Sequence, residues 1–117
     1  MRKLAIRSAL LVALVFPLLV LNAAAEPAQS TKTVQGKVLS SKDTPISGAV
    51  VYLQDGKTNS IRSFISTADG SYHFGQLATD TDYQVWARYK NEKSATRGVS
   101  SYDSRSKVII NLTIKSK

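Results

Sequence analysis

Four runs decide how this chain folds: VQGKVLS (residues 34–40), PISGAVVYL (45–53), STADGSYHF (66–74) and YQVWA (83–87). Within each run apolar and polar residues alternate at least in part, which is typical of a strand with one buried face. Gly, Pro, Asp and Asn fill the gaps between the runs and favour turns. The pattern predicts an all-β fold, a one-domain β-sandwich of short strands joined by turns.

The same alternation predicts seven strands, at residues 33–39, 48–54, 60–66, 71–75, 83–89, 95–101 and 107–114. Asp69-Gly70 predicts a hairpin turn, because Gly tolerates the positive φ that such turns need. In the third strand either Ile61 or Phe64 could face inward, and the consecutive Phe64-Ile65 leaves its register open. Alternation places these residues on the inner faces: Val34, Val38, Ala49, Val51, Leu53, Tyr72, Phe74, Tyr83, Val85, Ala87, Tyr89, Val108, Ile110, Leu112 and Ile114.

Residues 1–25 read as a secretory signal peptide. A basic start precedes an apolar stretch at residues 9–21, and Ala23-Ala24-Ala25 supplies the small residues that signal peptidase accepts, so a cut is expected before Glu26. The alternative is an uncleaved membrane anchor. A spanning helix needs roughly 20 apolar residues, and the apolar stretch here is shorter. Polar residues 26–32 are expected to form a disordered leader, and residues 33–115 the domain. The expected location is periplasmic or secreted, without stable membrane insertion after cleavage.

The charge and composition of the chain limit which classes of binding partner are expected. Without the signal, 92 residues remain, with thirteen Lys and Arg against eight Asp and Glu, which gives a net charge of +5. This excess favours acidic polymers, glycans or anionic headgroups, although solubility alone also explains it. No basic block is interleaved with aromatics, so nucleic acid is not an expected partner. The chain has no Cys, so the core must stabilise the fold without disulfides.

Several motifs resemble those of the carboxypeptidase regulatory-like domain. They are PISGA (45–49), TADGSY (67–72), Leu77 and YQV (83–85), and the likeness runs from about Val34 to Ile114. The resemblance implies a seven-stranded, Greek-key β-sandwich of the transthyretin-like, or prealbumin-like, type. In this family such residues serve the architecture, and members with this module usually lack catalysis of their own. The resemblance therefore implies a non-enzymatic module and leaves its ligand open.

The histidine and the aspartates of the chain do not form a pattern that predicts a catalytic or metal site. His73 is the only histidine, so a site of several histidines is not possible, and no nucleophile-elbow motif accompanies it. Related transthyretin-like enzymes that open hydroxyisourate rings end in Tyr-Arg-Gly-Ser, whereas this chain ends in TIKSK (113–117). Asp69, Asp80 and Asp82 could gather around calcium, but turn-forming and capping roles explain them more simply. No cofactor is expected.

Lys37 and Asn111 form the best pair for the Lys–Asn isopeptide bond found in pilin and adhesin repeats of this sandwich class. Alternation places both side chains outward. The strand that begins at Tyr83 offers Val85 and Ala87 on its inner face, where a buried acid would be needed. The bond is therefore not expected.

Tyr52, Trp86 and Arg88 are the candidate ligand-binding residues, because all three fall on predicted outer positions. An exposed Trp–Tyr pair can stack on sugar rings or anchor a protein, and Arg88 could bond hydroxyls or acids. A Trp covered by its neighbours is the alternative. The leading hypothesis is an exported, non-catalytic module that binds a carbohydrate or cell-envelope polymer. The other is a structural or assembly module that docks on another envelope protein, for example by an edge strand at residues 95–101.

Overall fold

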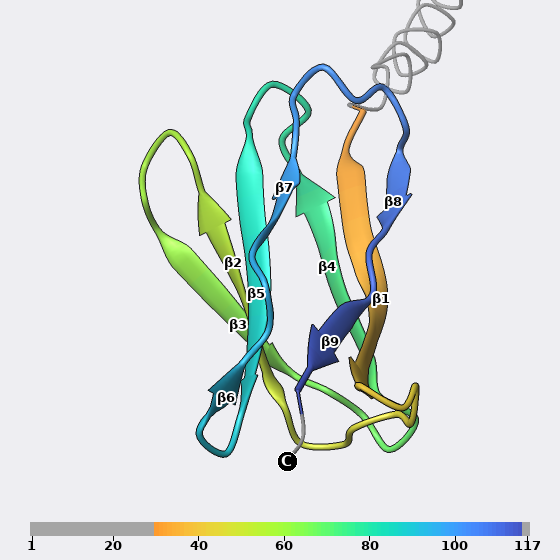
Figure 1. Ribbon diagram of the computed structural model, residues 1–117. Coiled ribbons are helices and arrows are strands. Elements are labelled where there is room, and N and C mark those ends of the chain that lie inside the picture. Colours follow the sequence, from red (N-terminus) through yellow and green to blue (C-terminus); the bar gives the residue numbers. More distant parts are fainter. Residues whose placement is uncertain (1–29, 116–117) are drawn as a thin grey trace, which may run out of the picture.

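The structure is a computed structural model, and it describes residues 30–115. The predicted signal peptide and most of the predicted leader lie outside these residues. Nine strands are present in the described part of the chain (Figure 1): β1 Lys32–Ser40, β2 Val50–Asp55, β3 Ile61–Ile65, β4 Ser71–Leu77, β5 Tyr83–Tyr89, β6 Glu92–Lys93, β7 Arg97–Val99, β8 Lys107–Ile109 and β9 Leu112–Ile114. None of the elements in residues 30–115 is a helix that could span a bilayer.

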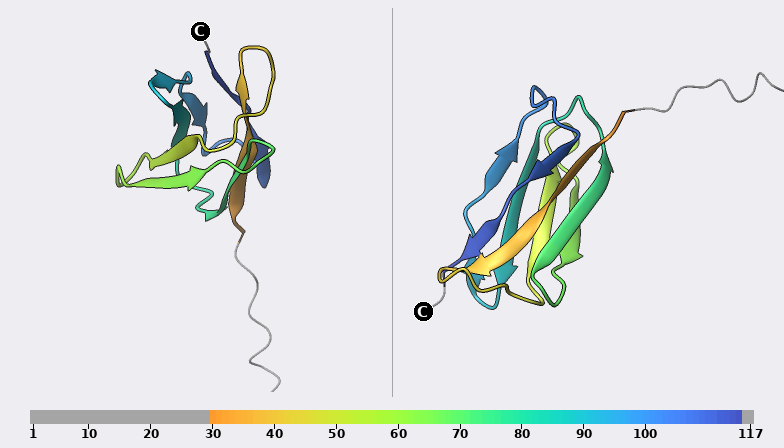
Figure 2. Two further views of the ribbon diagram at one scale, coloured as in Figure 1. Left: turned by 90° about the horizontal axis from the view of Figure 1, so that it is seen from below. Right: turned by 90° about the vertical axis from the view of Figure 1, so that its right-hand side faces the viewer.

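The strands form two sheets that face each other (Figures 1 and 2). The first has the order β4-β1-β8, with β9 also paired to β1. The second has the order β3-β2-β5-β6, with β7 also paired to β5. The predicted all-β sandwich is therefore confirmed, and β2 is central in its sheet. Nine strands replace the predicted seven because the last strand is split in two and the two-residue β6 follows β5.

The core lies between the sheets and follows the predicted alternation. Of the fifteen residues expected to face inward, all are buried except Tyr89, which is partly buried and packs against the core. In β3 the open choice is resolved: Phe64 packs against the core, whereas Ile61 is exposed. Burial of these side chains supplies the main stabilising term of a fold without disulfides.

The first strand begins at Lys32, so the prediction that Lys32 belongs to a disordered leader is wrong. Its side chain is only 1% exposed. The Lys32 Nζ donates hydrogen bonds to the carbonyls of Ser100 (3.1 Å) and Asp103 (2.7 Å) in the β7–β8 loop. A buried ammonium needs such partners, and here backbone carbonyls far along the chain supply them. No sequence pattern near Lys32 predicts these hydrogen bonds, because the acceptors lie far along the chain.

The fourth strand continues two residues beyond its predicted end. Between Lys32 and Val34 the register with β4 shifts, so that Lys32 faces Leu77 while Val34 faces Phe74. The extra β4 residue forms a bulge, with Gln76 at a positive φ of 53°. The bulge changes the side-chain parity and turns Leu77 into the core.

The last strand is interrupted at Ile110 and Asn111, where it changes its pairing along β1. β8 pairs in parallel with the first part of β1, and β9 with its last part. Between them, the Ile110 N–H donates to the Gln35 carbonyl (2.8 Å), and the Asn111 Oδ1 accepts from the Lys37 N–H (3.0 Å). The buried Tyr72 hydroxyl donates to the Ile110 carbonyl (2.6 Å). Side chains thus replace the ladder bonds that the interruption removes.

Gly36 permits this crossing, since a Cβ there would lie 1.9 Å from the Ile110 carbonyl oxygen. We predict that Gly36→Ala destabilises the domain by about 3 kcal/mol, because backbone rather than a flexible side chain would have to move. Urea unfolding followed by circular dichroism measures the change. Gly98→Ala is the matched control: a Cβ there meets no described atom within 4 Å. Similar losses in the two variants would contradict the close approach at Gly36.

Burial raises the pKa of Tyr72 well above its usual value. We predict that Tyr72→Phe lowers the free energy of unfolding by about 1–3 kcal/mol at neutral pH, because the Ile110 carbonyl loses its donor. The raised pKa means that the folded state keeps a proton that the unfolded state releases above about pH 10. The wild type therefore loses this stability as pH rises above about 10, and the gap to Tyr72→Phe narrows. A gap that widens with alkaline pH would contradict this assignment.

Candidate functional site

The three candidate residues lie together on the outer face of the second sheet. β2 and β5 are antiparallel neighbours, and their register sets Tyr52 opposite Trp86 and Val50 opposite Arg88. Each of these positions alternates with a buried residue, as Leu53, Val85 and Ala87 show. The interior of the sandwich therefore fixes the backbone beneath the candidate site.

Tyr52 and Trp86 stack on each other. Their ring centroids are 5.6 Å apart and their planes differ by 23°. The Lys93 Nζ lies over the Trp86 ring, 5.7 Å from its centroid. β2 and β6 flank β5 on opposite sides, so Tyr52 and Lys93 cover Trp86 from opposite sides. Trp86 is on the outer face as predicted, but it is half-buried between these neighbours.

The outer face extends beyond the three predicted residues. The register of β3 adds Ile61, Ser63 and Ile65, opposite Gln54, Tyr52 and Val50. Ile61 and Ile65 are 53% and 65% exposed. We call this surface the aromatic face; its residues are Val50, Tyr52, Gln54, Ile61, Ser63, Ile65, Gln84, Trp86, Arg88 and Lys93. It carries two cationic side chains, and none of these ten residues is acidic.

Sequence reasoning missed the β3 contribution because the register of Ile61–Ile65 was open. The signal that could have found it is the second-strand pattern, in which Val50 and Tyr52 face outward. A hairpin partner must match that alternation residue for residue, which places Ile61, Ser63 and Ile65 on the same side.

The acidic groups with shifted pKa values are not part of the aromatic face and hold turns and loops in place. Hydrogen bonds from Thr67 and Ser71 lower the pKa of Asp69 to about 2. The Arg105 side chain lowers the pKa of Asp103, to which it donates bidentately. The Ser101 N–H (2.6 Å) lowers the pKa of Asp82. The local contacts confirm the turn role expected of Asp69, whereas Asp82 accepts from a residue 19 positions further along the chain.

No three His, Cys, Asp or Glu side chains in residues 30–115 gather closely enough to hold a metal ion. Asp80 instead forms an exposed ion pair with Lys57 (2.9 Å). His73 is exposed on the outside of β4, opposite Gln35. Asn111, the partner considered for an isopeptide bond, uses its side-chain oxygen to accept from the Lys37 backbone N–H.

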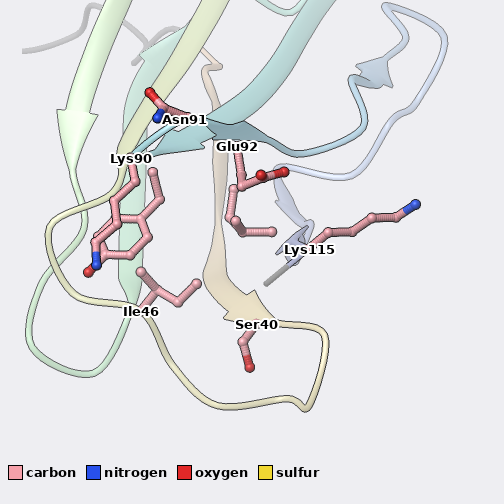
Figure 3. Close-up of a pocket in the computed structure, with 8 residues that line it drawn as sticks. Ser40, Ile46, Lys90, Asn91, Glu92 and Lys115 are labelled. Atoms are coloured by element: carbon pink, nitrogen blue, oxygen red, sulfur yellow. The ribbon is translucent and has the colours of Figure 1, made fainter. Parts of the chain in front are cut away.

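A separate cleft of about 520 Å³ opens at the end of the sandwich where the β5–β6 turn lies (Figure 3). Ile46, Tyr89 and Ile114 give it apolar walls. Lys90 has a positive φ of 56° in the turn, and its Nζ lies 5.3 Å from the centroid of the Tyr89 ring. Lys115 extends away from the other labelled side chains (Figure 3). The polar lining consists of Ser40, Lys90, Asn91, Glu92 and Lys115.

A comparison with family models matches residues 33–115 to the carboxypeptidase regulatory-like domain. The match spans most of the chain, and the chain belongs to this family, as the sequence motifs predicted. A search of curated protein sequences gives no match.

Solved structures show the same fold at low identity. The dioxygenase domain of a dioxygenase carbohydrate-binding protein fusion from Streptomyces sp. SirexAA-E aligns with a TM-score of 0.59 and 13% identity, over 80% of this chain and 84% of that one. Catechol 1,2-dioxygenase from Acinetobacter sp. ADP1 gives 0.58 and 10%, over 79% and 54%. BcpA, the major pilin subunit of Bacillus cereus, gives 0.60 and 13%, over 75% and 31%. This chain thus spans about half or less of the last two, and these likenesses bear on fold alone.

The Tyr52–Trp86 stack predicts an energetic coupling that folding alone can report. In a double-mutant cycle with Tyr52→Ala and Trp86→Ala, we expect a coupling of about 0.5–1.5 kcal/mol, the range of aromatic pairs beyond area burial. Chemical denaturation of the four proteins measures it. As a matched pair without contact, Tyr102→Ala with Trp86→Ala should be additive, since Tyr102 is 95% exposed in the β7–β8 loop. Additivity in both cycles would argue against the stack.

Proposed function

We propose that this domain is an exported, non-catalytic binding module whose aromatic face binds an acidic carbohydrate or cell-envelope polymer. The family match and the pilin neighbour fit a non-catalytic module. Export rests on the signal peptide predicted at residues 1–25. The observation that carries the binding proposal is the aromatic face itself, in which a stacked Tyr–Trp pair lies beside Arg88 and Lys93 and none of the ten residues is acidic.

The charges on this face favour an anionic ligand. Arg88 is exposed and offers a planar set of N–H donors suited to a carboxylate or phosphate. Lys93 adds a second positive charge beside Trp86. Gln54 and Gln84 add amide donors and acceptors at the end of the face nearer the β2–β3 turn, where they lie opposite each other. A sugar with acidic groups could use all three kinds of contact.

Within the aromatic pair, Tyr52 is the residue that contacts the ligand in this proposal. Both sides of Trp86 are occupied, by Tyr52 and by Lys93. On its other side Tyr52 has Ser63 directly opposite, whose side chain is small, and Tyr52 itself is partly exposed. Trp86 then supports the ring of Tyr52 from behind, and Arg88 binds the charged groups of the ligand.

Protein docking is the second candidate, because Ile61 and Ile65 expose large aliphatic side chains on the same face. A sugar ring gains little from isoleucine, whereas a protein interface buries such residues at its centre. The edge strand first expected to dock, residues 95–101, is reduced to the three residues of β7. This shifts the docking candidate from that edge to the β3 side of the sheet.

Binding to an array of acidic and neutral envelope glycans tests the proposal. We predict binding to acidic polymers, a loss of affinity of about tenfold or more in Tyr52→Ala, and weaker salt dependence in Arg88→Gln. In Tyr52→Ala, the loss of binding free energy should exceed the loss of folding free energy measured by thermal melting. Tyr102→Ala is the matched control, since it removes an exposed tyrosine away from the face.

Two outcomes would count against this function. Equal binding by wild type and Tyr52→Ala would remove the aromatic face from recognition. Absence of glycan binding, together with capture of an envelope protein that is lost in Ile65→Lys, would favour the docking candidate.

A further inference from the structure

β3 is the least protected edge among the strands that the structure describes. Each sheet ends in edge strands, and natural proteins protect these with bulges, charges, prolines or very short lengths. β4 carries the bulge at Gln76, while β6, β7, β8 and β9 have only two or three residues each. β3 pairs over five residues with β2 in an unbroken register, lies at the outside of its sheet (Figure 1), and contains no Lys, Pro, Asp or Glu.

The hydrogen-bond parity of β3 shows which of its backbone groups are free. Next to the β2–β3 ladder, the Asp55 N–H donates to the Ser60 carbonyl at one end and the Ser66 N–H to the Ala49 carbonyl at the other. Bonded pairs alternate in an antiparallel ladder, so Arg62 and Phe64 bond to β2. Ile61, Ser63 and Ile65 therefore direct their N–H and C=O groups away from β2, and no residue of 30–115 bonds them.

The residues of this edge that have free backbone groups are of the same type on both sides of the central residue, Ser63. Ile61 and Ile65 are two residues either side of Ser63, and all three have their side chains on the aromatic face and their free backbone groups on the open edge. If an identical strand lay antiparallel with Ser63 opposite Ser63, each Ile61 would face an Ile65. The three residues of each strand would then satisfy one another's backbone groups in six hydrogen bonds, by the alternation of such ladders.

We propose that the domain forms a two-fold symmetric dimer in which β3 pairs antiparallel with β3 of a second copy, centred on Ser63. Both five-stranded sheets join into one sheet across the dimer axis. Ile61 and Ile65 of the two copies pack in two cross-strand pairs on the outer surface. An isologous contact of this kind uses the same patch twice, as closed dimers require.

The charges on β3 are compatible with this register. Arg62 is the charged residue of β3, and in the paired strands it lies opposite Phe64 of the other copy rather than opposite another Arg62. Like charges directly opposite would destabilise the ladder, and this arrangement avoids them. Arg88 and Lys93 lie on β5 and β6, two or more strands from the dimer axis. The dimer does not depend on the proposed ligand and goes beyond it.

Sedimentation velocity over a range of concentrations, with protein produced from the full-length coding sequence, tests the dimer. We expect reversible dimers in the wild type. In the double variant Ile61→Lys with Ile65→Lys, a lysine faces a lysine twice across the axis, and we expect dimerisation to weaken by roughly a hundredfold. The substituted side chains are exposed, so circular dichroism should show an unchanged fold.

A charge swap tests the register itself. In Ile61→Lys with Ile65→Glu, each lysine faces a glutamate of the other copy, so dimers should persist, and added salt should weaken them. Ile109→Lys is the matched control, because Ile109 is an equally exposed isoleucine (62%) on β8 of the other sheet, and it should dimerise as the wild type does. Ser63→Pro removes an N–H that points to the open edge, not to β2, and should give a folded monomer.

A wild type that stays monomeric at all concentrations would overturn the proposal. So would dimers that survive the Lys–Lys variant, a Lys–Glu variant as dissociated as the Lys–Lys variant, or dimers lost through Ile109→Lys. Should the Lys–Lys variant fail to fold, Ser63→Pro decides in its place, and a folded dimer of that variant would refute β3 pairing.

Discussion

The fold depends on the close approach of the Ile110 backbone to Gly36. β1 is the only described strand that pairs with β4, β8 and β9, and the chain must shift along β1 to pair with it twice. At that shift the Ile110 carbonyl occupies the space of a side chain on residue 36 and receives the Tyr72 hydroxyl from β4. One glycine and one buried hydroxyl thus connect the three ladders of the first sheet. The second sheet packs on this assembly mainly through core residues of β2 and β5 that alternation specifies.

Alternation was sufficient to predict the fold because burial of one face dictates side-chain parity in every strand. Val51, Val85 and Leu112 are buried as expected. The features that escaped prediction involve partners distant in the chain. Lys32 is buried because carbonyls of Ser100 and Asp103 receive it, and Leu77 is buried because of a bulge that no local motif announces. A single sequence contains no record of such pairings.

The candidate site was predictable in part for the same reason. Parity placed Tyr52 and Trp86 on the outer face, and the structure sets them in contact. Sequence reasoning could not show that Lys93 covers the second side of Trp86, because this depends on the short β5–β6 turn, which folds β6 back along β5. It also left Ile61 and Ile65 unassigned, because it did not use the alternation of β2 to set the register of β3. In the proposed binding mode, Tyr52 contacts the ligand and Trp86 supports the tyrosine ring from behind.

The parallel pairing of the first and last strands has a mechanical consequence. β1, which starts at Lys32, begins at one end of the sandwich, and β9, which ends at Ile114, finishes at the other (Figure 1). β1 and β9 are hydrogen-bonded side by side in the same direction. A force applied between these two residues pulls β1 and β9 past each other along their length. The ladder bonds are then loaded together in shear rather than opened one after another as in a zipper. Tension along the chain would therefore load the β1–β9 pairing, beside the Gly36 crossing, in the direction in which its bonds resist together.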